Sequence, residues 1–261
     1  MTFSADFLIS LVAAYIWPFT RLASMLMTML VLSSQSVPAT VRLFYCMMLT
    51  AVIAPVLPAM PAVNLFSATG MLITAQQVLI GVAVGFVSQM VIQAFILAGQ
   101  IISMQTSLGF ASMVDPLNGE STPVVGQIYL MLSTLVFFAI DGHLIMIKMI
   151  SQSFITLPVG EVGLSLDAIR EIPHFVANIF EAALAFSLSA TIALLLINFT
   201  FGVMTRAAPQ LNVFSMGFAV TMLSGLFILW ITIGGFVTHF ENHWNRTQQL
   251  MCQILQLPCS E

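Results

Sequence analysis

The sequence predicts an all-α, polytopic integral membrane protein built from about six apolar helical segments. Hydrophobic residues make up 59% of its 261 residues, and only 6% are charged. Soluble domains contain about 25% charged residues, so water cannot solvate a surface this poor in charge. The apolar runs also have the length of about 20 residues that a membrane-spanning helix needs. We expect a single helical membrane domain over residues 1–261.

The first two apolar segments contain features that a simple membrane helix lacks. Residues 7–32 include Pro18, which removes a helical hydrogen bond and favours a kink, and Arg21. A guanidinium at membrane depth should face the protein interior or reach an interface. Residues 41–57 form the second segment, and three prolines rule out a longer helix there.

Residues 67–104 contain no proline and predict an over-long helix. At about 1.5 Å per residue it would extend about 57 Å, whereas the hydrocarbon core is about 30 Å thick. The helix must therefore tilt steeply, break near Gly81 or Gly85, or leave the bilayer within a larger assembly. The same excess length recurs between Pro173 and Arg206.

Small and polar residues form a stripe along this predicted helix. They recur at spacings of three, four or seven, which places them on one helical face. We favour a helix–helix contact, because small residues permit close approach and glutamines bond across helices. A polar passage is the alternative. The stripe consists of Gly81, Gly85, Gln89, Gln93, Gln100, Ser103 and Ser107.

The second half of the chain predicts three further spans and two polar elements. The spans cover residues 124–150, 175–204 and 213–239. Residues 165–175 hold several charges, which is typical of a short interfacial helix, and residues 241–261 predict an amphipathic tail. Glu181 is the best intramembrane acid; a proton-sensing role is the minority interpretation, and a position at the interface is favoured.

Residues 206–212 predict a connection between two helices. Arg206 complements the C-terminal end of the preceding helix, Pro209 stops that helix, and Asn212 can cap the next one. Nothing beyond a helix–turn–helix connection is needed to explain these residues.

The sequence contains no arrangement that supports catalysis. His239, Glu241 and His243 give H-x-E-x-H, which is not the H-E-x-x-H spacing of a zinc site. Paired intramembrane aspartates and a glycine-rich phosphate loop do not occur in it. The net charge of -4 provides no basic face for nucleic acid. We therefore expect a protein that is not an enzyme and binds no cofactor, metal ion or nucleic acid.

The stretch Gly99–Gln127 interrupts the apolar pattern and is the candidate functional centre. It contains glycines, hydroxyl groups, glutamines, two acids and two prolines between long apolar runs. Non-helical backbone at membrane depth is costly unless it lines a wet cavity or is buried in protein. We therefore expect the rest of the chain to hold this stretch in place.

Two sequence motifs stand out, G-F-A-x-x-x-D-P and A-P-Q-x-N-x-F-x-x-G-F. The residues of the first motif are Gly109, Phe110, Ala111, Asp115 and Pro116; those of the second, after Arg206, include Pro209, Gln210, Asn212 and Phe214. Together they resemble the FliR family of export-gate proteins, which belong to the flagellar type III secretion apparatus. Length and segment order agree with that family over essentially the whole chain.

This resemblance implies a subunit of a helical, pore-forming export gate in the bacterial inner membrane, at the flagellar basal body. The implied partners are FliP-like and FliQ-like subunits, an FlhB-like switch protein, unfolded export substrates and membrane lipid. Residues 98–123 would form the pore plug or gating loop, of which Gln105–Thr122 match the family's plug, with Phe110 and Met113 as an apolar seal. The implied plug residues are Gln105, Gly109, Phe110, Ala111, Met113, Asp115, Pro116 and Gly119.

Three other functions are alternatives. An injectisome subunit would have the same architecture, although the D-P and A-P-Q-L-N motifs are more similar to those of the flagellar proteins. A stand-alone small-solute transporter would bind its solute at the polar break, but no internal repeat between the two halves supports it. A purely structural membrane scaffold is the third.

Overall fold

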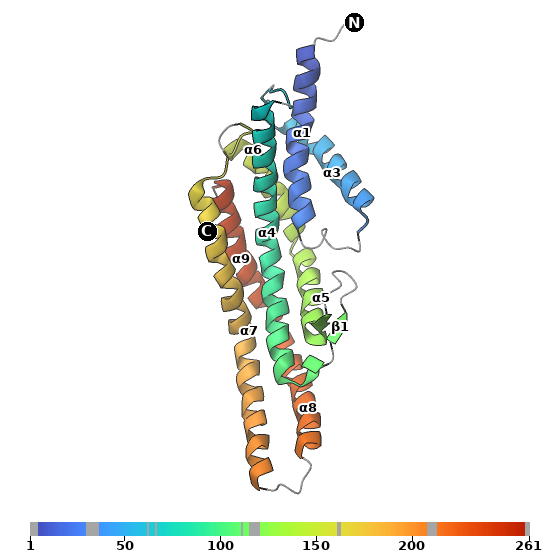
Figure 1. The fold of residues 1–261 in the computed structure, drawn as a ribbon, viewed down its shortest axis with the longest axis vertical. Helices are drawn as coiled ribbons and strands as arrows, with labels where there is room; N and C mark the ends of the chain where they lie inside the picture. Colours follow the sequence, from blue (N-terminus) through green and yellow to red (C-terminus); the bar gives the residue numbers. More distant parts are fainter. Residues whose placement is uncertain are drawn as a thin grey trace. The chain divides into compact units, whose positions relative to one another are not determined.

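The computed structural model describes residues 5–29, 37–61, 63–65, 67–110, 112–114, 121–160, 163–207 and 213–258. Helices dominate this part of the chain, and a two-stranded antiparallel hairpin is the one sheet within it. The predicted all-α fold is therefore confirmed, with a small hairpin added. The elements in chain order are α1 (Ala5–Thr28), α3 (Ala39–Ile53), η1 (Ala54–Val56), α4 (Ala68–Gln105), η2 (Leu108–Phe110), β1 (Ser112–Val114), β2 (Ser121–Pro123), α5 (Val124–Ala139), α6 (Gly142–Thr156), α7 (Leu166–Ala207), α8 (Val213–Ile233) and α9 (Phe236–Leu255) (Figure 1).

Among the described residues, three helices are long and apolar enough to cross a membrane. They are α3 extended through η1 (Ala39–Val56), α4 and α7. The bent pairs α5–α6 and α8–α9 raise the number to five if each pair is one span. All six predicted apolar segments are helical, since the first corresponds to α1. The chain is thus a polytopic helical membrane protein.

The chain forms two compact units. Unit 1 contains Met1–Met90, Phe137–Phe175 and Asn245–Glu261, and unit 2 contains Val91–Val136 and Val176–Trp244. The boundaries between the units fall inside α4, α5, α7 and α9. Each unit has its own set of buried apolar side chains.

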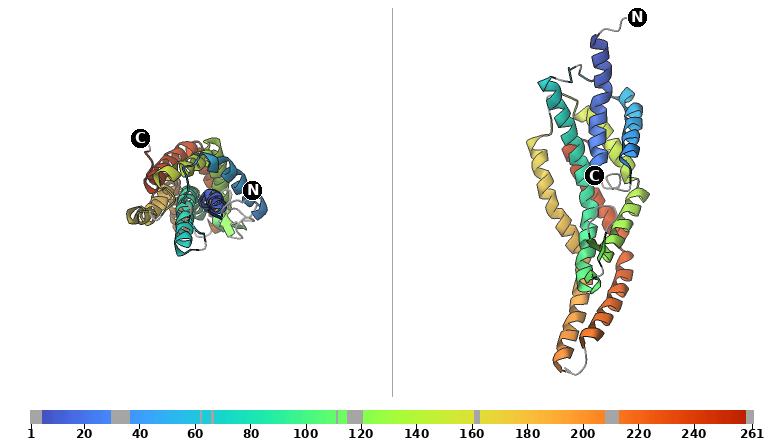
Figure 2. Two further views of the ribbon diagram at one scale, coloured as in Figure 1. Left: turned by 90° about the horizontal axis from the view of Figure 1, so that it is seen from above. Right: turned by 45° about the vertical axis from the view of Figure 1, so that its right-hand side comes forward.

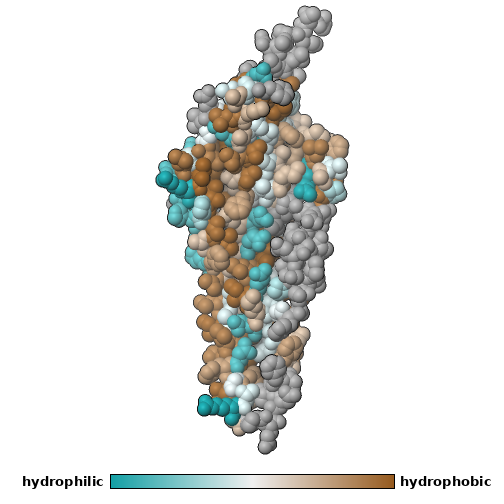
Figure 3. Space-filling view, viewed as in Figure 1, coloured by the Kyte–Doolittle hydropathy of each residue, from teal (hydrophilic) through white to brown (hydrophobic). Residues whose placement is uncertain are grey.

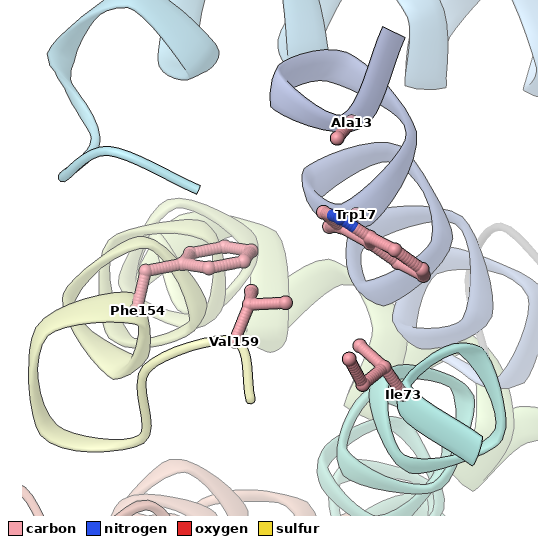
Figure 4. Close-up of a cluster of buried hydrophobic side chains, with 5 residues drawn as sticks. All are labelled: Ala13, Trp17, Ile73, Phe154 and Val159. Carbon is pink, nitrogen blue, oxygen red and sulfur yellow. The ribbon is translucent and has the colours of Figure 1, made fainter. Parts of the chain in front are cut away.

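The core of unit 1 lies between α1, α4 and α6. Trp17 of α1 is fully buried and shares a cluster with Ile73 of α4, Phe154 of α6 and Val159, which follows α6 (Figure 4). Ala13 lies one turn before Trp17 in the same cluster. Burial of each large apolar side chain stabilises the fold by about 1.5–3 kcal/mol. The cluster therefore joins three helices that are distant in sequence.

The helix α4 is continuous over 38 residues. The predicted excess length is therefore confirmed, and the predicted alternative of a break near Gly81 or Gly85 is wrong. Both glycines lie against α1, where an added Cβ atom would collide with Ser24 at Gly81 and with Thr28 at Gly85. At these two positions the stripe is a helix–helix contact that only glycine allows.

The apolar run expected as one span over residues 124–150 is divided into α5 and α6, which meet at a bend of 60°. Asp141 at the bend has a positive φ of 56°, which helix interiors do not accommodate. Gly142 follows, and an added Cβ atom there would collide with the ring of Phe137. Backbone conformation and packing together fix this bend.

The helix α7 spans 42 residues and corrects the prediction of a separate interfacial helix over residues 165–175. Ser165 caps the N-terminus of α7, because its Oγ accepts a hydrogen bond from Ala168 N at 3.1 Å. Pro173 lies inside the helix. The neighbouring residues Arg170 and Glu171 are exposed, so water can reach the carbonyl group that the proline leaves without a donor.

Large apolar side chains are exposed along α7, in keeping with an apolar environment around it. They appear as a brown surface over this helix in Figure 3 and include Phe180, Leu184, Leu188, Ile192, Leu195, Leu196 and Phe199. Within unit 2, α7 and α8 run antiparallel and side by side (Figure 2), and Gly217 of α8 faces the ring of Phe201. The helix α8 also exposes large apolar side chains, among them Phe218, Leu223 and Phe227.

The core of unit 2 is a group of aromatic rings around Phe95 of α4. Its ring centroid lies 5.5 Å from that of Phe186 of α7, and 4.9 and 5.5 Å from those of Phe236 and Phe240 of α9. Tyr129 of α5 joins this group through Phe186 and Phe236. Aromatic pairs in these geometries add about 0.5–1.5 kcal/mol beyond area burial.

The last predicted span, residues 213–239, also divides at a bend. The helices α8 and α9 meet at Gly234–Gly235 with a bend of 58°. Residues 241–255 of the predicted amphipathic tail belong to α9. In this helix Leu250 is buried, whereas Glu241 is exposed.

Candidate functional site between α4 and α5

The predicted plug residues lie partly within the described structure. Gln105 is the last residue of α4, Gly109 and Phe110 belong to η2, and Met113 is in β1. The helix α4 therefore includes residues 98–105 of the predicted loop. The parts outside the described residues are Ala111, Asp115, Pro116, Gly119 and the side chains of Phe110 and Met113.

The start of the segment is fixed to α7. The Asn198 side chain donates a hydrogen bond from Nδ2 to the Gln105 carbonyl oxygen at 3.3 Å. The last four carbonyl groups of a helix have no partner within it, so Asn198 satisfies one such group. A single amide in an apolar stretch of α7 thus has a specific role at the end of α4.

The next two residues are fixed to α8. Thr106 is fully buried, and an added Cβ atom at Gly225 would collide with its methyl group. The Ser107 hydroxyl group lies 3.1 Å from Thr221 Oγ1. Thr221 donates its own proton to Phe218 O at 3.0 Å, so Ser107 is the donor to Thr221. We call Gln105, Thr106 and Ser107 the N-terminal anchor.

The end of the segment is formed by the hairpin and α5. In the hairpin, Met113 pairs with Thr122 and Val114 with Ser121, and α5 begins directly after β2. A hairpin of two short strands is marginally stable by itself. Its position therefore depends on the helices to which its two ends connect.

The helices α4 and α5 approach each other closely beyond the hairpin. An added Cβ atom at Gly99 would lie 2.7 Å from Gly126 Cα and 2.8 Å from Tyr129 Cδ2. A side chain at Gly99 would therefore separate the helices, whereas an added Cβ atom at Gly126 would lie 3.5 Å from Ile96 O, an ordinary contact. We call Gly126 and Tyr129 the C-terminal anchor. Both ends of the segment are thus held by buried contacts within unit 2.

The lower part of the predicted stripe has mixed exposure. Gln89 and Gln100 are half-buried and Gln93 is exposed. Ser103 is fully buried. Ser107 lies beyond the end of α4 with a φ of 59° and belongs to the N-terminal anchor.

The other predicted site residues are at or near the surface where the structure describes them. Glu181 is exposed on α7, and Arg206 is exposed in the last turn of the same helix. Among the described residues, no group of three His, Cys, Asp or Glu side chains could hold a metal ion. Phe214 belongs to α8, and its side chain, together with Pro209, Gln210 and Asn212, lies outside the described residues.

Sequence reasoning missed the residues that hold the anchors in place. Asn198, Thr221 and Gly225 were not among the predicted site residues, although a polar amide or a glycine within an apolar helix is a signal of helix contact.

In unit 1, Arg21 faces the interior, which is one of the two positions predicted for it. It donates from Nε to Gln77 Oε1 at 2.7 Å, from Nη1 to Ser153 Oγ at 2.9 Å and from Nη2 to Leu157 O at 3.0 Å.

Comparison with known proteins places the chain in a family. Residues 12–247 match the model of "Bacterial export proteins, family 1". The chain is 38% identical to the flagellar biosynthetic protein FliR of Escherichia coli K12 over 215 residues, which cover 82% of each chain. It is 31% identical to FliR of Pectobacterium carotovorum over 98% of its length and 97% of the relative. It is 24% identical to FliR of Bacillus subtilis over 96% of its length and 97% of the relative. The chain therefore belongs to the FliR family and is a membrane-embedded component of the flagellar export apparatus.

Proposed function

We propose that the chain is a non-enzymatic subunit of the flagellar type III protein export gate. It lies in the bacterial inner membrane at the flagellar basal body and forms part of the export pore with FliP-like and FliQ-like subunits. Its segment Gln105–Thr122 acts as a plug that seals the pore until unfolded substrates pass. The C-terminal tail lies near an FlhB-like switch protein at the cytoplasmic entrance.

The observation that carries the plug assignment is the fixation of both ends of the segment. Asn198 and Thr221 form hydrogen bonds with the N-terminal anchor, and the C-terminal anchor packs directly against Gly99. A pore seal needs a fixed base, because a loop with loose ends would not return to the same place after each opening. The family match and the apolar helices support the membrane location.

The length of the segment suits a plug. Residues 108–120 lie between the N-terminal anchor and β2, and 13 extended residues span at most about 45 Å. With the pairing of β1 and β2 released, the segment is therefore long enough to project about 20 Å from its anchors and return. Apolar side chains such as Phe110 and Met113 would close a pore by excluding water, and Gly109 would allow the loop to change conformation with little strain.

The test replaces residues 108–120 with a short Gly-Ser linker in the complex co-expressed with its partner subunits. The linker keeps Ser107 and Ser121, so both anchors remain. We expect the complex to assemble and to conduct small ions in a planar bilayer while idle. Conductance that stays at the closed level of the unmodified complex would show that the segment is not the plug.

Two control variants separate sealing from folding. A variant with residues 108–120 in scrambled order keeps length and composition, and the double substitution Phe110→Ser and Met113→Ser keeps the backbone. We expect the double substitution to leak and the assembly to stay intact. Co-purification is the second test: an export-gate subunit elutes in a large hetero-oligomer with FliP-like and FliQ-like proteins, whereas a solute transporter elutes alone or as a small homo-oligomer.

A further inference from the structure

The two helix bends differ in what fixes them. At the α5–α6 bend, the positive φ of Asp141 and the contact of Gly142 with Phe137 dictate the backbone. At the α8–α9 bend, the nearest atom to an added Cβ is 3.5 Å away at Gly234 and 3.8 Å away at Gly235, which is ordinary van der Waals contact. Neither glycine has a left-handed φ. Packing and backbone conformation therefore do not require glycine at the second bend.

A glycine pair without a packing role makes this bend adaptable. Glycine has more accessible backbone conformations than any other residue and weakens a helix relative to alanine. Gly234 and Gly235 are both exposed, so a change of their dihedral angles meets little resistance from neighbouring side chains. Hinges in proteins consist of a few such residues at the ends of helices.

Tyr129 contacts both sides of this bend. Its hydroxyl oxygen lies 3.2 Å from Thr232 Oγ1, at the end of α8. Its ring stacks on that of Phe236, at the start of α9, with centroids 5.7 Å apart and planes at 19°. Thr232 donates its own proton to Leu229 O at 3.0 Å, so Tyr129 is the donor to Thr232. One fully buried side chain thus ties α8 to α9 across Gly234–Gly235.

The position of Tyr129 is itself fixed by α4. Its ring lies directly against Gly99, where an added Cβ atom would lie 2.8 Å from Tyr129 Cδ2. Phe186 also contacts it edge-on at a centroid distance of 5.3 Å. Tyr129 therefore cannot follow a movement of α8, and such a movement must break its hydrogen bond to Thr232.

A rotation of α8 at this bend would reach the N-terminal anchor. Thr221, which accepts the hydrogen bond from Ser107, precedes Gly234 and Gly235 by 13 and 14 residues, or about 20 Å of helix. A rotation of about 10° then displaces Thr221 by about 3.5 Å. This displacement exceeds the tolerance of a hydrogen bond, so Ser107 must either move with α8 or lose its partner.

We propose that Gly234–Gly235 is a hinge, that Tyr129 holds it in the observed bend, and that rotation of α8 about it moves Thr106 and Ser107. The contact of Thr106 with Gly225 and the bond of Ser107 to Thr221 transmit the movement. The hinge follows from packing alone; only its consequence for export rests on the proposed function. Opening of the export path would then begin at α8 and reach the segment through its N-terminal anchor.

The test is hydrogen–deuterium exchange, followed by mass spectrometry, on the assembled complex. Tyr129→Phe removes the hydroxyl group and keeps the ring. We expect amides of residues 229–237 to exchange about fivefold faster, because a single hydrogen bond of ordinary strength is lost. We expect the Thr106 amide, which donates to Ile102 O at 3.1 Å, to exchange faster as well.

Matched variants show whether a change in exchange rate is due to the hydrogen bond between Tyr129 and Thr232. Thr232→Val removes the acceptor and should reproduce Tyr129→Phe without adding to it, whereas Thr232→Ser keeps the acceptor and should behave as the unmodified chain. Tyr45→Phe removes an equivalent hydroxyl group from a half-exposed side chain of α3 and should change neither region. Gly234→Ala with Gly235→Ala should slow exchange at the bend and abolish the effect of Tyr129→Phe on Thr106.

Unchanged exchange over residues 229–237 in Tyr129→Phe would overturn the role of Tyr129. Faster exchange there with no change at Thr106 would overturn the coupling to the N-terminal anchor. The exchange experiment is independent of ion conductance, so a linker variant that fails to leak would refute the plug and leave these results standing.

Discussion

Arg21→Met removes the cation from the interior of unit 1 and keeps an unbranched side chain. In the unmodified chain the guanidinium donates three hydrogen bonds and lies over the Phe154 ring, with Cζ 4.1 Å from the ring centroid. None of the carboxylates that the structure describes forms a salt bridge with it. Arg21 is therefore held by uncharged groups.

The loss of stability expected for Arg21→Met comes mainly from the acceptors that lose their hydrogen-bond donor. Ser153 keeps its own bond to Ile150 O at 2.6 Å, but Gln77 Oε1 and the Leu157 carbonyl lose a donor in a buried environment. Each unsatisfied acceptor costs about 1–3 kcal/mol, and the lost cation–π contact costs about 1 kcal/mol. These losses total about 3–7 kcal/mol, and relief from burying a charge offsets about 1–3 kcal/mol of them. We expect a net destabilisation of about 2–4 kcal/mol.

The assay is thermal unfolding of the purified chain in detergent, followed by size-exclusion chromatography after heating. At about 2–4 °C per kcal/mol for a chain of this size, the midpoint should fall by about 4–16 °C. Arg206→Met is the matched control, because Arg206 is exposed, and it should leave the midpoint within about 2 °C.

An Arg21→Met midpoint equal to that of the unmodified chain would refute the reasoning, because it would mean that relief of charge burial balances all the lost bonds. The double substitution Arg21→Met with Gln77→Leu provides a further check. It removes one unsatisfied acceptor together with its donor, and should regain about 1–2 kcal/mol relative to Arg21→Met alone.

Four further substitutions are checked by the same thermal assay. Gly85→Val should destabilise by at least about 1–3 kcal/mol, because its side chain would collide with Thr28 of α1; an unchanged midpoint would contradict the close α1–α4 contact. Gly142→Ala should cost about 1–3 kcal/mol at the α5–α6 bend, whereas Gly202→Ala, with no neighbouring atom within 4 Å, should stabilise by about 0.5–1 kcal/mol. Phe95→Ala should cost about 3–5 kcal/mol, and a smaller loss than that of Gly142→Ala would argue against an aromatic core in unit 2.

The length of the helices was predictable, and their bends were less so. The span of α4 follows from apolar residues without proline, and the structure agrees to within about one residue at each end. Hydropathy did not reveal the α5–α6 bend, because both sides of it are apolar, and it did not reveal the α8–α9 bend, because the apolar run of α8 continues into the first turn of α9. The dipeptides Asp141–Gly142 and Gly234–Gly235 were the available signals, since such pairs mark turns.

Pro173 shows the opposite error. A proline inside a helical pattern predicts a boundary, yet α7 continues through it. The lost hydrogen bond lies near the start of the helix, where exposed polar residues bring water to the backbone. Pro173 therefore leaves α7 unbroken, because water can satisfy the carbonyl group that the proline leaves without a donor.

The break between α4 and α5 was predictable from the sequence, but the contacts that hold its two ends were not. The polar interruption is visible in composition because its neighbours are apolar. The partners of its anchor are 93 residues away for Gln105 and Asn198, and 114 residues away for Ser107 and Thr221. A pattern along one sequence contains no information on which distant amide or hydroxyl group will meet which helix end.

The same separation has a consequence for biosynthesis. A ribosome adds about 5–20 residues per second, so Thr221 follows Ser107 by roughly 6–23 s. During this interval the N-terminal anchor has been inserted, but the helices that will hold it have not been made. The final positions of Thr106 and Ser107 are therefore set only when α8 enters the membrane, and a nascent chain that stops after α7 would carry this segment without its partner on α8.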